Sequence, residues 1–317
     1  MSLSRRTILK CGLGAGAAIL CDRLPAFAAP HAALITKPIP SSGERIPVIG
    51  LGSAGTFDLA RGHLEYDVGR DVIRLFHQLG GRVIDTAPTY QRSELFIGET
   101  ARSLDIQHEL FLATKVNVGA AGGAAARQQM ENSSQVFGKR VIDLMQVWNL
   151  GDSIRNLTDA YLDAHMETVL AWKAAGRCRY IGITTSRDPQ YADVETAMRR
   201  FRIDFVQLDY SIGDRLPEQR LLPLAQERGI AVIANRPFTT GSLFRLVAGK
   251  SLPSWSAAAD IDSWAQFFLT FVVSHPAVTC AIPATGDTAH LRDNMGACSG
   301  ALPDAAMRRR MAAFFDA

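Results

Sequence analysis

Short runs of apolar, often β-branched residues alternate regularly with longer amphipathic stretches along most of the chain. Each run is nearly continuous in apolar residues and is bounded by Gly, Asp, Asn or Pro, which is typical of strands buried on both faces. The runs expected to form strands are 83–85, 110–115, 141–147, 180–183, 205–208, 230–234 and 278–282. One more barrel strand is expected near residue 48, after a hairpin strand at 33–37.

Helical periodicity fills the intervals between these runs. In 67–79 the apolar positions fall on one stripe, and 158–175 shows the same spacing before Gly176, a residue type common just past helix ends. Further helices are expected over 93–103, 189–200, 217–228 and 261–274. Strand and helix alternate without a linker or a shift in composition. The pattern therefore predicts an α/β fold, a single-domain (β/α)8 TIM barrel.

A doubly wound dinucleotide-binding sheet is the competing architecture. It would place Gly-x-Gly-x-x-Gly at the first strand–helix turn, and residues 50–55 match that spacing. However, 56–65 is irregular, and the first clear helix is expected only near residue 67. Because the glycines lack a strand–turn–helix context, the barrel is preferred.

The N-terminus differs from the rest of the chain. Arg5 and Arg6 precede a mildly apolar run rich in Gly and Ala, and Ala-Phe-Ala at 26–28 supplies the small residues of a cleavage site. Paired arginines before a weakly hydrophobic core are typical of a twin-arginine signal. We expect a signal peptide over 1–28, the barrel over 29–317, and a periplasmic location. The alternative is a basic N-terminus with a short amphipathic helix.

Removal of this signal would change the charge balance. Residues 1–28 carry a net charge of +3 and the whole chain also carries +3, so the remainder is close to neutral. A neutral body argues against nucleic acid or an anionic membrane surface as a partner. No internal stretch reaches the roughly 18–20 apolar residues of a membrane span, so no stable membrane anchor is expected.

The cysteines and histidines give no sign of a metal site. Three cysteines follow residue 28, an odd number without motif spacing, and we interpret them as small buried residues. The sequence has no Cys-x-x-Cys motif and no clustered histidine pair. No metal is therefore expected.

Chemically useful side chains follow three successive strands, at the end where a barrel carries its active site. Asp85 ends the run at 83–85 and Tyr90 follows it, Lys115 ends the next run, and Trp148 follows the run after that. A tyrosine has an unperturbed pKa of about 10, too high for efficient proton transfer near neutrality. An adjacent lysine ammonium stabilises the phenolate and lowers that pKa, and an aspartate keeps the lysine charged and oriented. Such a set can protonate a carbonyl oxygen as hydride reaches the carbon.

Longer motifs surround these residues in a fixed order. The segments are 49–52, 85–94, 95–99, 113–115, 143–147, 180–186, 206–211 and 282–294. Through them the chain resembles the aldo-keto reductase family from about Ile46 to Asn294. The resemblance implies that Asp85, Tyr90 and Lys115 occupy three of the family's four catalytic positions, with Tyr90 as general acid/base.

The fourth catalytic position departs from the family. It is normally a histidine at the end of strand four, and this chain has Trp148 there. The indole Nε1–H donates one hydrogen bond but neither accepts one nor titrates. Trp148 therefore either keeps the donor role without a proton relay or serves only as a packed wall.

The resemblance also implies a nicotinamide dinucleotide bound in extended form across the barrel mouth. The resemblance implies that Tyr210 stacks on the nicotinamide and that Thr185, Ser186 and Gln207 contact its carboxamide. It also implies that a loop covers the pyrophosphate, with Arg236, Pro237, Gly241 and Leu243. Asn294, at a helix start, is implied to contact the adenine. Relatives that prefer NADPH have a lysine and an arginine where this chain has Ala284 and His290. NADP(H) is expected over NAD(H), with selectivity in question.

The implied function is an NAD(P)(H)-dependent oxidoreductase acting on a small aldehyde, ketone or alcohol. Because Trp148 replaces the family histidine, one alternative is a catalytically weakened nucleotide-binding sensor or interaction protein on the same scaffold. Another is a barrel that binds a small ligand without the cofactor. No pool of reduced nicotinamide is expected outside the cytoplasm. Either an exported protein keeps its cofactor and a redox partner recycles it, or the signal is inefficient. Substrate identity and oligomeric state stay open.

Overall fold

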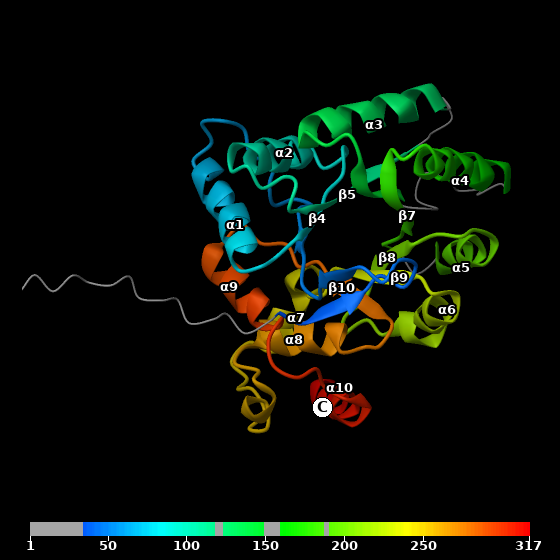
Figure 1. Ribbon diagram of the computed structural model, residues 1–317. Coiled ribbons are helices and arrows are strands. Elements are labelled where there is room, and N and C mark those ends of the chain that lie inside the picture. The colour runs from blue at the N-terminus through cyan, green and yellow to red at the C-terminus, as the bar shows by residue number, and fades with distance from the viewer. Residues whose placement is uncertain (1–33, 118–122, 149–158, 187–189) are drawn as a thin grey trace, which may run out of the picture. The chain divides into compact units, whose positions relative to one another are not determined.

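Eight parallel strands form the centre of the described part of the chain, in sequence order around the sheet (Figure 1). They are β3 (Leu51–Gly52), β4 (Val83–Asp85), β5 (Phe111–Val116), β6 (Ile142–Val147), β7 (Cys178–Thr184), β8 (Phe205–Asp209), β9 (Ala231–Asn235) and β10 (Val278–Ala281). The computed structural model describes residues 34–117, 123–148, 159–186 and 190–317. The expected signal over 1–28 lies outside these residues.

The sheet closes into a barrel because its first and last strands meet. Ile49 bridges Ala281 and Gly52 bridges Ala284, both in parallel. At Gly52 this seam is tight, since a Cβ there would lie 2.7 Å from the carbonyl oxygen of Ile282. Only glycine allows the two backbones to approach so closely. The predicted (β/α)8 barrel is confirmed.

Helices surround the strands (Figure 1). The longer ones are α1 (Tyr66–Gln78), α2 (Ser93–Ser103), α3 (Gly123–Phe137), α4 (Asp159–Ala174), α5 (Tyr191–Arg200), α6 (Leu221–Arg228), α8 (Trp264–Val273), α9 (Thr288–Gly296) and α10 (Ala305–Asp316). The predicted bounds of α2 are confirmed, α1 differs from its prediction by one residue at each end, and α4 ends one residue before its predicted end. The predicted first residue of α4, 158, lies outside the described residues. No helix in the described ranges is long and apolar enough to cross a membrane.

Several helical segments differ from the expectation, among them α9 and α10, which were not predicted. The single helix expected over 217–228 is instead a 3-10 turn, η2 (Leu216–Gln219), followed by α6. Pro223 has no N–H to bond the carbonyl four residues earlier, so a continuous helix would be broken there. The helix α3 was not predicted, because two of its four buried positions are the small residues Ala126 and Ser133.

A hairpin closes the N-terminal end of the barrel. Strands β1 (Thr36–Pro38) and β2 (Arg45–Pro47) pair antiparallel, and Ile39 and Ile46 belong to the apolar cluster inside the barrel. Lys37 Nζ donates to three backbone carbonyl oxygens in the segment that joins α8 to β10, at 2.6–2.8 Å. The hairpin is therefore a fixed part of the barrel.

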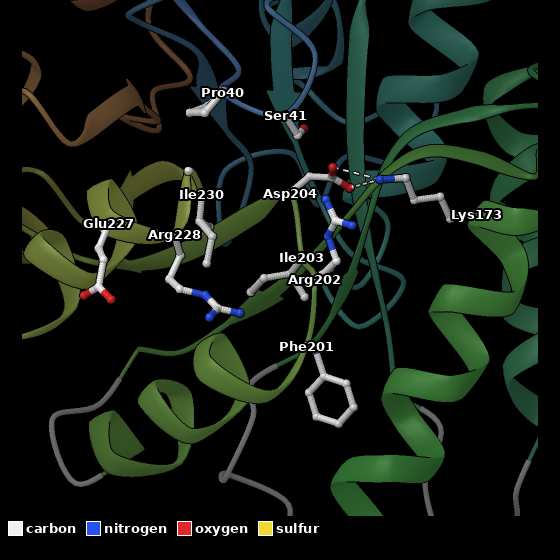
Figure 2. A pocket seen from close by; sticks show the side chains of 11 residues that line it. Pro40, Ser41, Lys173, Phe201, Arg202, Ile203, Asp204, Glu227, Arg228 and Ile230 are labelled. Carbon is white, nitrogen blue, oxygen red and sulfur yellow. Dashed lines mark hydrogen bonds and ion pairs between the residues drawn. The ribbon is translucent and has the colours of Figure 1, made fainter.

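A hollow of about 800 Å³ lies at this same N-terminal end, beside the hairpin turn and the segments leading into β8 and β9 (Figure 2). Asp204 lies on its wall and is paired with Lys173 at 2.6 Å, while Arg202 and Arg228 stand on its rim (Figure 2). None of the residues predicted to carry chemistry lines it. The strand ends that carry chemistry lie at the opposite end of the barrel.

Side chains from alternate strands fill the barrel in layers. One buried apolar layer consists of Val83, Leu144, Phe205 and Cys280. The layer above it, two residues further along the same segments, consists of Asp85, Gln146, Gln207 and Ile282, all buried. The apolar core thus ends one layer below the mouth, and the last layer is mainly polar.

His275, just after α8, should make stability depend on pH. Burial and the nearby Arg308 lower its pKa to about 4 from 6.5, and its Nδ1 accepts the N–H of Ala277 at 3.1 Å. Because the unfolded chain binds a proton first as the pH falls, this contribution to stability is lost between about 6.5 and 4. We expect a loss of about 2 kcal/mol after allowing for solvent screening.

The measurement is urea unfolding of wild type and His275→Gln at pH 7 and at pH 4.5. The stability difference between the two pH values should be smaller in the variant. An equal difference in both proteins would contradict this role for His275.

Candidate active site

The centre of the site is a buried ion pair between Asp85, at the end of β4, and Lys115, in β5. Lys115 Nζ donates to Asp85 Oδ2 at 2.5 Å and to the carbonyl oxygen of Thr86 at 2.9 Å. The two side chains are 3% and 1% exposed. At such burial each charge requires the other, because an unpaired ion in the interior is very costly.

The phenol of Tyr90 lies against this pair. Lys115 Nζ is 4.9 Å from the centre of the Tyr90 ring. Burial lowers the pKa of Lys115, but the charge of Asp85, the phenol of Tyr90 and hydrogen bonds to both outweigh burial and raise that pKa above its ordinary value. Lys115 is therefore an ammonium beside a phenol, as the sequence predicts.

The other oxygen of Asp85 accepts hydrogen bonds from two amides. Gln146 Nε2 in β6 lies 3.0 Å from Asp85 Oδ1, and Gln207 Nε2 in β8 lies 2.8 Å from the same atom. Together with Lys115, three side chains donate to one carboxylate. These donors satisfy both oxygens of the buried carboxylate.

A second carboxyl group, Glu94 in the first turn of α2, is buried behind Lys115. It accepts hydrogen bonds from Thr114 Oγ1 at 2.5 Å and Ser133 Oγ at 2.9 Å. Burial raises the pKa of Glu94, although these hydroxyls and the charge of Lys115 act in the other direction. Glu94 thus ties α2, β5 and α3 together and takes a proton more readily than an exposed glutamate.

A cavity of about 700 Å³ opens above the polar layer, at the C-terminal ends of the strands. Its lining residues are Gly52, Ser53, Ala54, Asp85, Tyr90, Trp148, Ser186, Gln207, Asn235, Arg236, Pro237, Phe238, Thr240, Gly241, Phe244, Ile282, Pro283 and Ala284. Two buried atoms of this wall, Ser53 Oγ and Asn235 Oδ1, have no hydrogen-bond partner among the described residues. Such atoms are rare in proteins, and a bound molecule would satisfy them.

The structure brings the four expected catalytic residues together. Asp85, Tyr90 and Trp148 line the cavity, and Lys115 lies beneath it. No group of three or more His, Cys, Asp or Glu in the described ranges could hold a metal ion. The arrangement at this mouth places an ammonium beside a phenol, and a phenol in this position could donate a proton to a bound molecule.

The expected cofactor residues divide into two groups. Five line the cavity: Ser186, Gln207, Arg236, Pro237 and Gly241. Thr185 and Leu243 do not: both are 1% exposed, and Thr185 Oγ1 donates instead to Gln190 Oε1 at 2.6 Å.

The expected stacking role of Tyr210 is wrong in this structure. Its side chain is fully buried and packs against Phe271 and His275, away from the cavity lining. Its hydroxyl donates to Glu218 and accepts from Arg308 Nη2 at 2.7 Å. This hydrogen-bonded network between η2 and α10 turns the ring outward from the barrel mouth.

The expected position of Asn294 also needs correction. Asn294 lies in the last turn of α9, not at a helix start, and is 3% exposed. The helix starts after Asp287, whose carboxylate accepts the N–H groups of Ala289 and His290 at 2.7 and 2.9 Å. These bonds lower the pKa of Asp287. His290 itself is exposed, in the first turn.

The loop after β9 has an unusual backbone where it borders the cavity. Arg236, Thr239 and Thr240 adopt left-handed conformations with φ of 46°, 47° and 52°. Such residues cost of order 1 kcal/mol each and cluster at ligand sites. Arg236 Nη1 is held by Asp209 Oδ2 at 2.9 Å and by the carbonyl oxygen of Ser186 at 3.1 Å. The loop is thus a constrained rim.

Sequence reasoning missed several residues of this site. The signal for Gln146 was a single amide side chain near the end of an otherwise apolar strand. Gln146 lies two residues after Leu144 and therefore faces the same side of the strand. Asn235 could have been found because it is a polar residue at the end of an apolar strand. Phe238 and Phe244 gave no signal, because aromatic residues after a strand usually pack in the core.

Comparison with known proteins places this site in a family. The model of the aldo/keto reductase family matches residues 48–313, and the chain belongs to that family.

Individual relatives are distant. Norsolorinic acid reductase B of Aspergillus parasiticus is 27% identical over 61% of this chain, and the chain spans only 55% of its length. Methylglyoxal reductase YeaE of Escherichia coli is 28% identical over 81% of this chain and 88% of its own. A Klebsiella pneumoniae aldo-keto reductase, solved with NADPH, has a TM-score of 0.71 at 23% identity, covering 89% of this chain and 96% of that one. This likeness shows the shared fold.

The buried ion pair should dominate the stability of the site. Lys115→Met leaves the Asp85 carboxylate buried without its cation, so the free energy of unfolding should fall by about 3–5 kcal/mol. In urea unfolding, the double variant Asp85→Asn with Lys115→Met should lose less than the two single losses combined, because no lone charge remains. A loss below about 1 kcal/mol for Lys115→Met would refute the pairing argument.

Proposed function

We propose that this chain is an NAD(P)H-dependent oxidoreductase that reduces an aldehyde or ketone, or oxidises the corresponding alcohol, by hydride transfer. The observation that carries the proposal is the Tyr90 phenol held against the buried Asp85–Lys115 pair at the edge of a cavity. Membership of the aldo/keto reductase family supports it.

Each residue of the site has a definite task in this reaction. A bound nicotinamide supplies the hydride. Tyr90 donates its hydroxyl proton to the carbonyl oxygen as negative charge develops there, and Lys115 stabilises the phenolate that remains. Asp85 keeps Lys115 charged and oriented. Trp148 offers its Nε1–H as a hydrogen-bond donor in place of the family histidine.

The cavity wall fits a nicotinamide nucleotide. The Ser53 hydroxyl can donate or accept a hydrogen bond and the Asn235 amide oxygen accepts one, and carboxamide and ribose groups can supply both kinds of partner. Ser186, Gln207 and the constrained loop from Arg236 to Gly241 would hold the nucleotide at the rim.

For the cofactor we propose NADP(H) with weak discrimination against NAD(H). The Klebsiella pneumoniae neighbour was solved with NADPH, which supports the first part. The second part follows from the positions that would meet the 2′-phosphate: Ala284 carries no charge, His290 offers an exposed imidazole and not a guanidinium, and the Asp287 carboxylate caps α9 between them. A preference above about a hundredfold in dissociation constants, in either direction, would contradict this.

The substrate is proposed to be a small uncharged carbonyl compound. Among the described lining residues Arg236 is the single cation, and it is already paired with Asp209. The remaining wall is largely aromatic or apolar, with Trp148, Phe238 and Phe244 at the cavity.

We further propose that residues 1–28 direct export to the periplasm by the twin-arginine route, on the sequence pattern alone. A redox partner would then recycle the nucleotide.

The proposed proton donor is tested by Tyr90→Phe, which removes one oxygen from the site. We expect kcat for carbonyl reduction to fall by about 10²–10⁴-fold, because the general acid is lost. Nucleotide dissociation constants, measured by tryptophan fluorescence, should change less than threefold. Unchanged turnover in this variant would refute the mechanism.

A nucleotide-binding sensor is the second candidate, and Trp148 is the observation that favours it. Trp148→His restores the family residue, so an attenuated enzyme should gain about tenfold or more in kcat. The measurement is steady-state turnover across a panel of aldehydes, ketones and sugars, with nucleotide binding measured in parallel. Tight nucleotide binding without turnover in either protein would instead support the sensor.

A further inference from the structure

Gln146 is a buried amide that the catalytic residues above do not include. It is 0% exposed, lies in the top layer of the barrel interior directly above Leu144, and does not line the cavity. Burying a polar side chain at such a position costs free energy unless it is hydrogen-bonded. An apolar residue of equal size would fit a core layer without that cost.

The hydrogen bonds of Gln146 fix which way its amide faces. Its Nε2 donates to Asp85 Oδ1 at 3.0 Å, and its Oε1 accepts Gln207 Nε2 at 3.4 Å. Turning the amide over would place an oxygen against the carboxylate and a nitrogen against a nitrogen. The neighbours therefore select the arrangement in which Gln146 donates to Asp85.

The two amides that bind Asp85 differ in their surroundings. Gln207 lines the cavity, where a ligand can compete for its amide. Gln146 lies below the cavity lining and is enclosed by the strands, so its bond to Asp85 Oδ1 persists when the site fills. It thereby prevents the carboxylate from rotating, and Asp85 in turn directs Lys115 Nζ through Oδ2.

We propose that Gln146 is a positioning residue for proton transfer. It holds the Asp85 carboxylate as a fixed anion, and through it keeps the Lys115 ammonium aimed at the Tyr90 phenol. This role rests on the proposed function, because the benefit is a correctly placed proton donor.

Two variants of similar size separate this role from simple packing. Gln146→Met keeps the length of the side chain and removes the donor. We expect kcat to fall about 10–100-fold, while KM and the nucleotide dissociation constant change less than threefold. Gln266→Met is the matched control, since Gln266 Nε2 donates to the Asp293 carboxylate at 2.8 Å, in α8 and α9. Its kcat should stay within twofold of wild type.

Gln146→Glu adds a readout that packing would not produce. The introduced carboxyl faces Asp85, with Lys115 and Tyr90 beyond it and Glu94 behind Lys115. When protonated it donates to Asp85 as the amide does, and when ionised it repels that carboxylate. Its kcat should therefore exceed that of Gln146→Met at acidic pH, and the advantage should disappear as the pH rises. A ratio of the two kcat values that is constant with pH would overturn the proposal.

A stability measurement tests the Gln146–Asp85 bond without turnover. Gln146→Met should lower the urea midpoint of unfolding at least twice as much in wild type as in Asp85→Asn, because a bond to a carboxylate is stronger than one to a neutral amide. Equal shifts in the two backgrounds would overturn the proposal even in an inactive protein. Absence of turnover in wild type would instead count against the proposed function alone.

Discussion

The site depends on one constraint, the cost of keeping the charges of Asp85 and Lys115 out of water. Neither is tolerated alone at their depth, and both oxygens of the carboxylate need donors. The barrel meets this need by placing an amide at the equivalent height of two other strands, in Gln146 and Gln207. The top of the core is therefore polar by necessity, and the first apolar layer lies two residues lower on each strand.

Two carboxyl groups share the single ammonium of Lys115, and their surroundings separate their roles. Asp85 receives three side-chain donors, one of which is the Lys115 ammonium. Glu94 has two hydroxyl donors, and burial raises its pKa. Lys115 thus has one strong anionic partner, on the side of the barrel interior.

The sequence predicted the barrel because its strands are short apolar runs and its helices have clear stripes. It also predicted Asp85, Tyr90 and Lys115, because strand-end positions in a barrel converge wherever the loops run. It failed where the direction of a side chain is set by distant partners. The Tyr210 ring is held away from the cavity by hydrogen bonds to Glu218 and Arg308, and Arg308 lies 98 residues further along the chain. The prediction that Asn294 lies at a helix start is wrong because Asp287 caps α9 and sets its first residue. The importance of Gln146 follows only from its hydrogen bond to Asp85.

The seam of the barrel has a consequence for how the chain reaches its native state. Ile49 and Gly52 pair with Ala281 and Ala284, and Lys37 binds carbonyl groups of residues 273–278. These contacts join the first and last strands of the barrel, so the loop they close contains nearly the whole barrel. Contacts of such sequence separation form slowly, because the entropy of the intervening chain must be lost before they contribute. Closure at this seam is therefore a late event in folding, and a nascent chain still lacking its last strand has an open sheet edge.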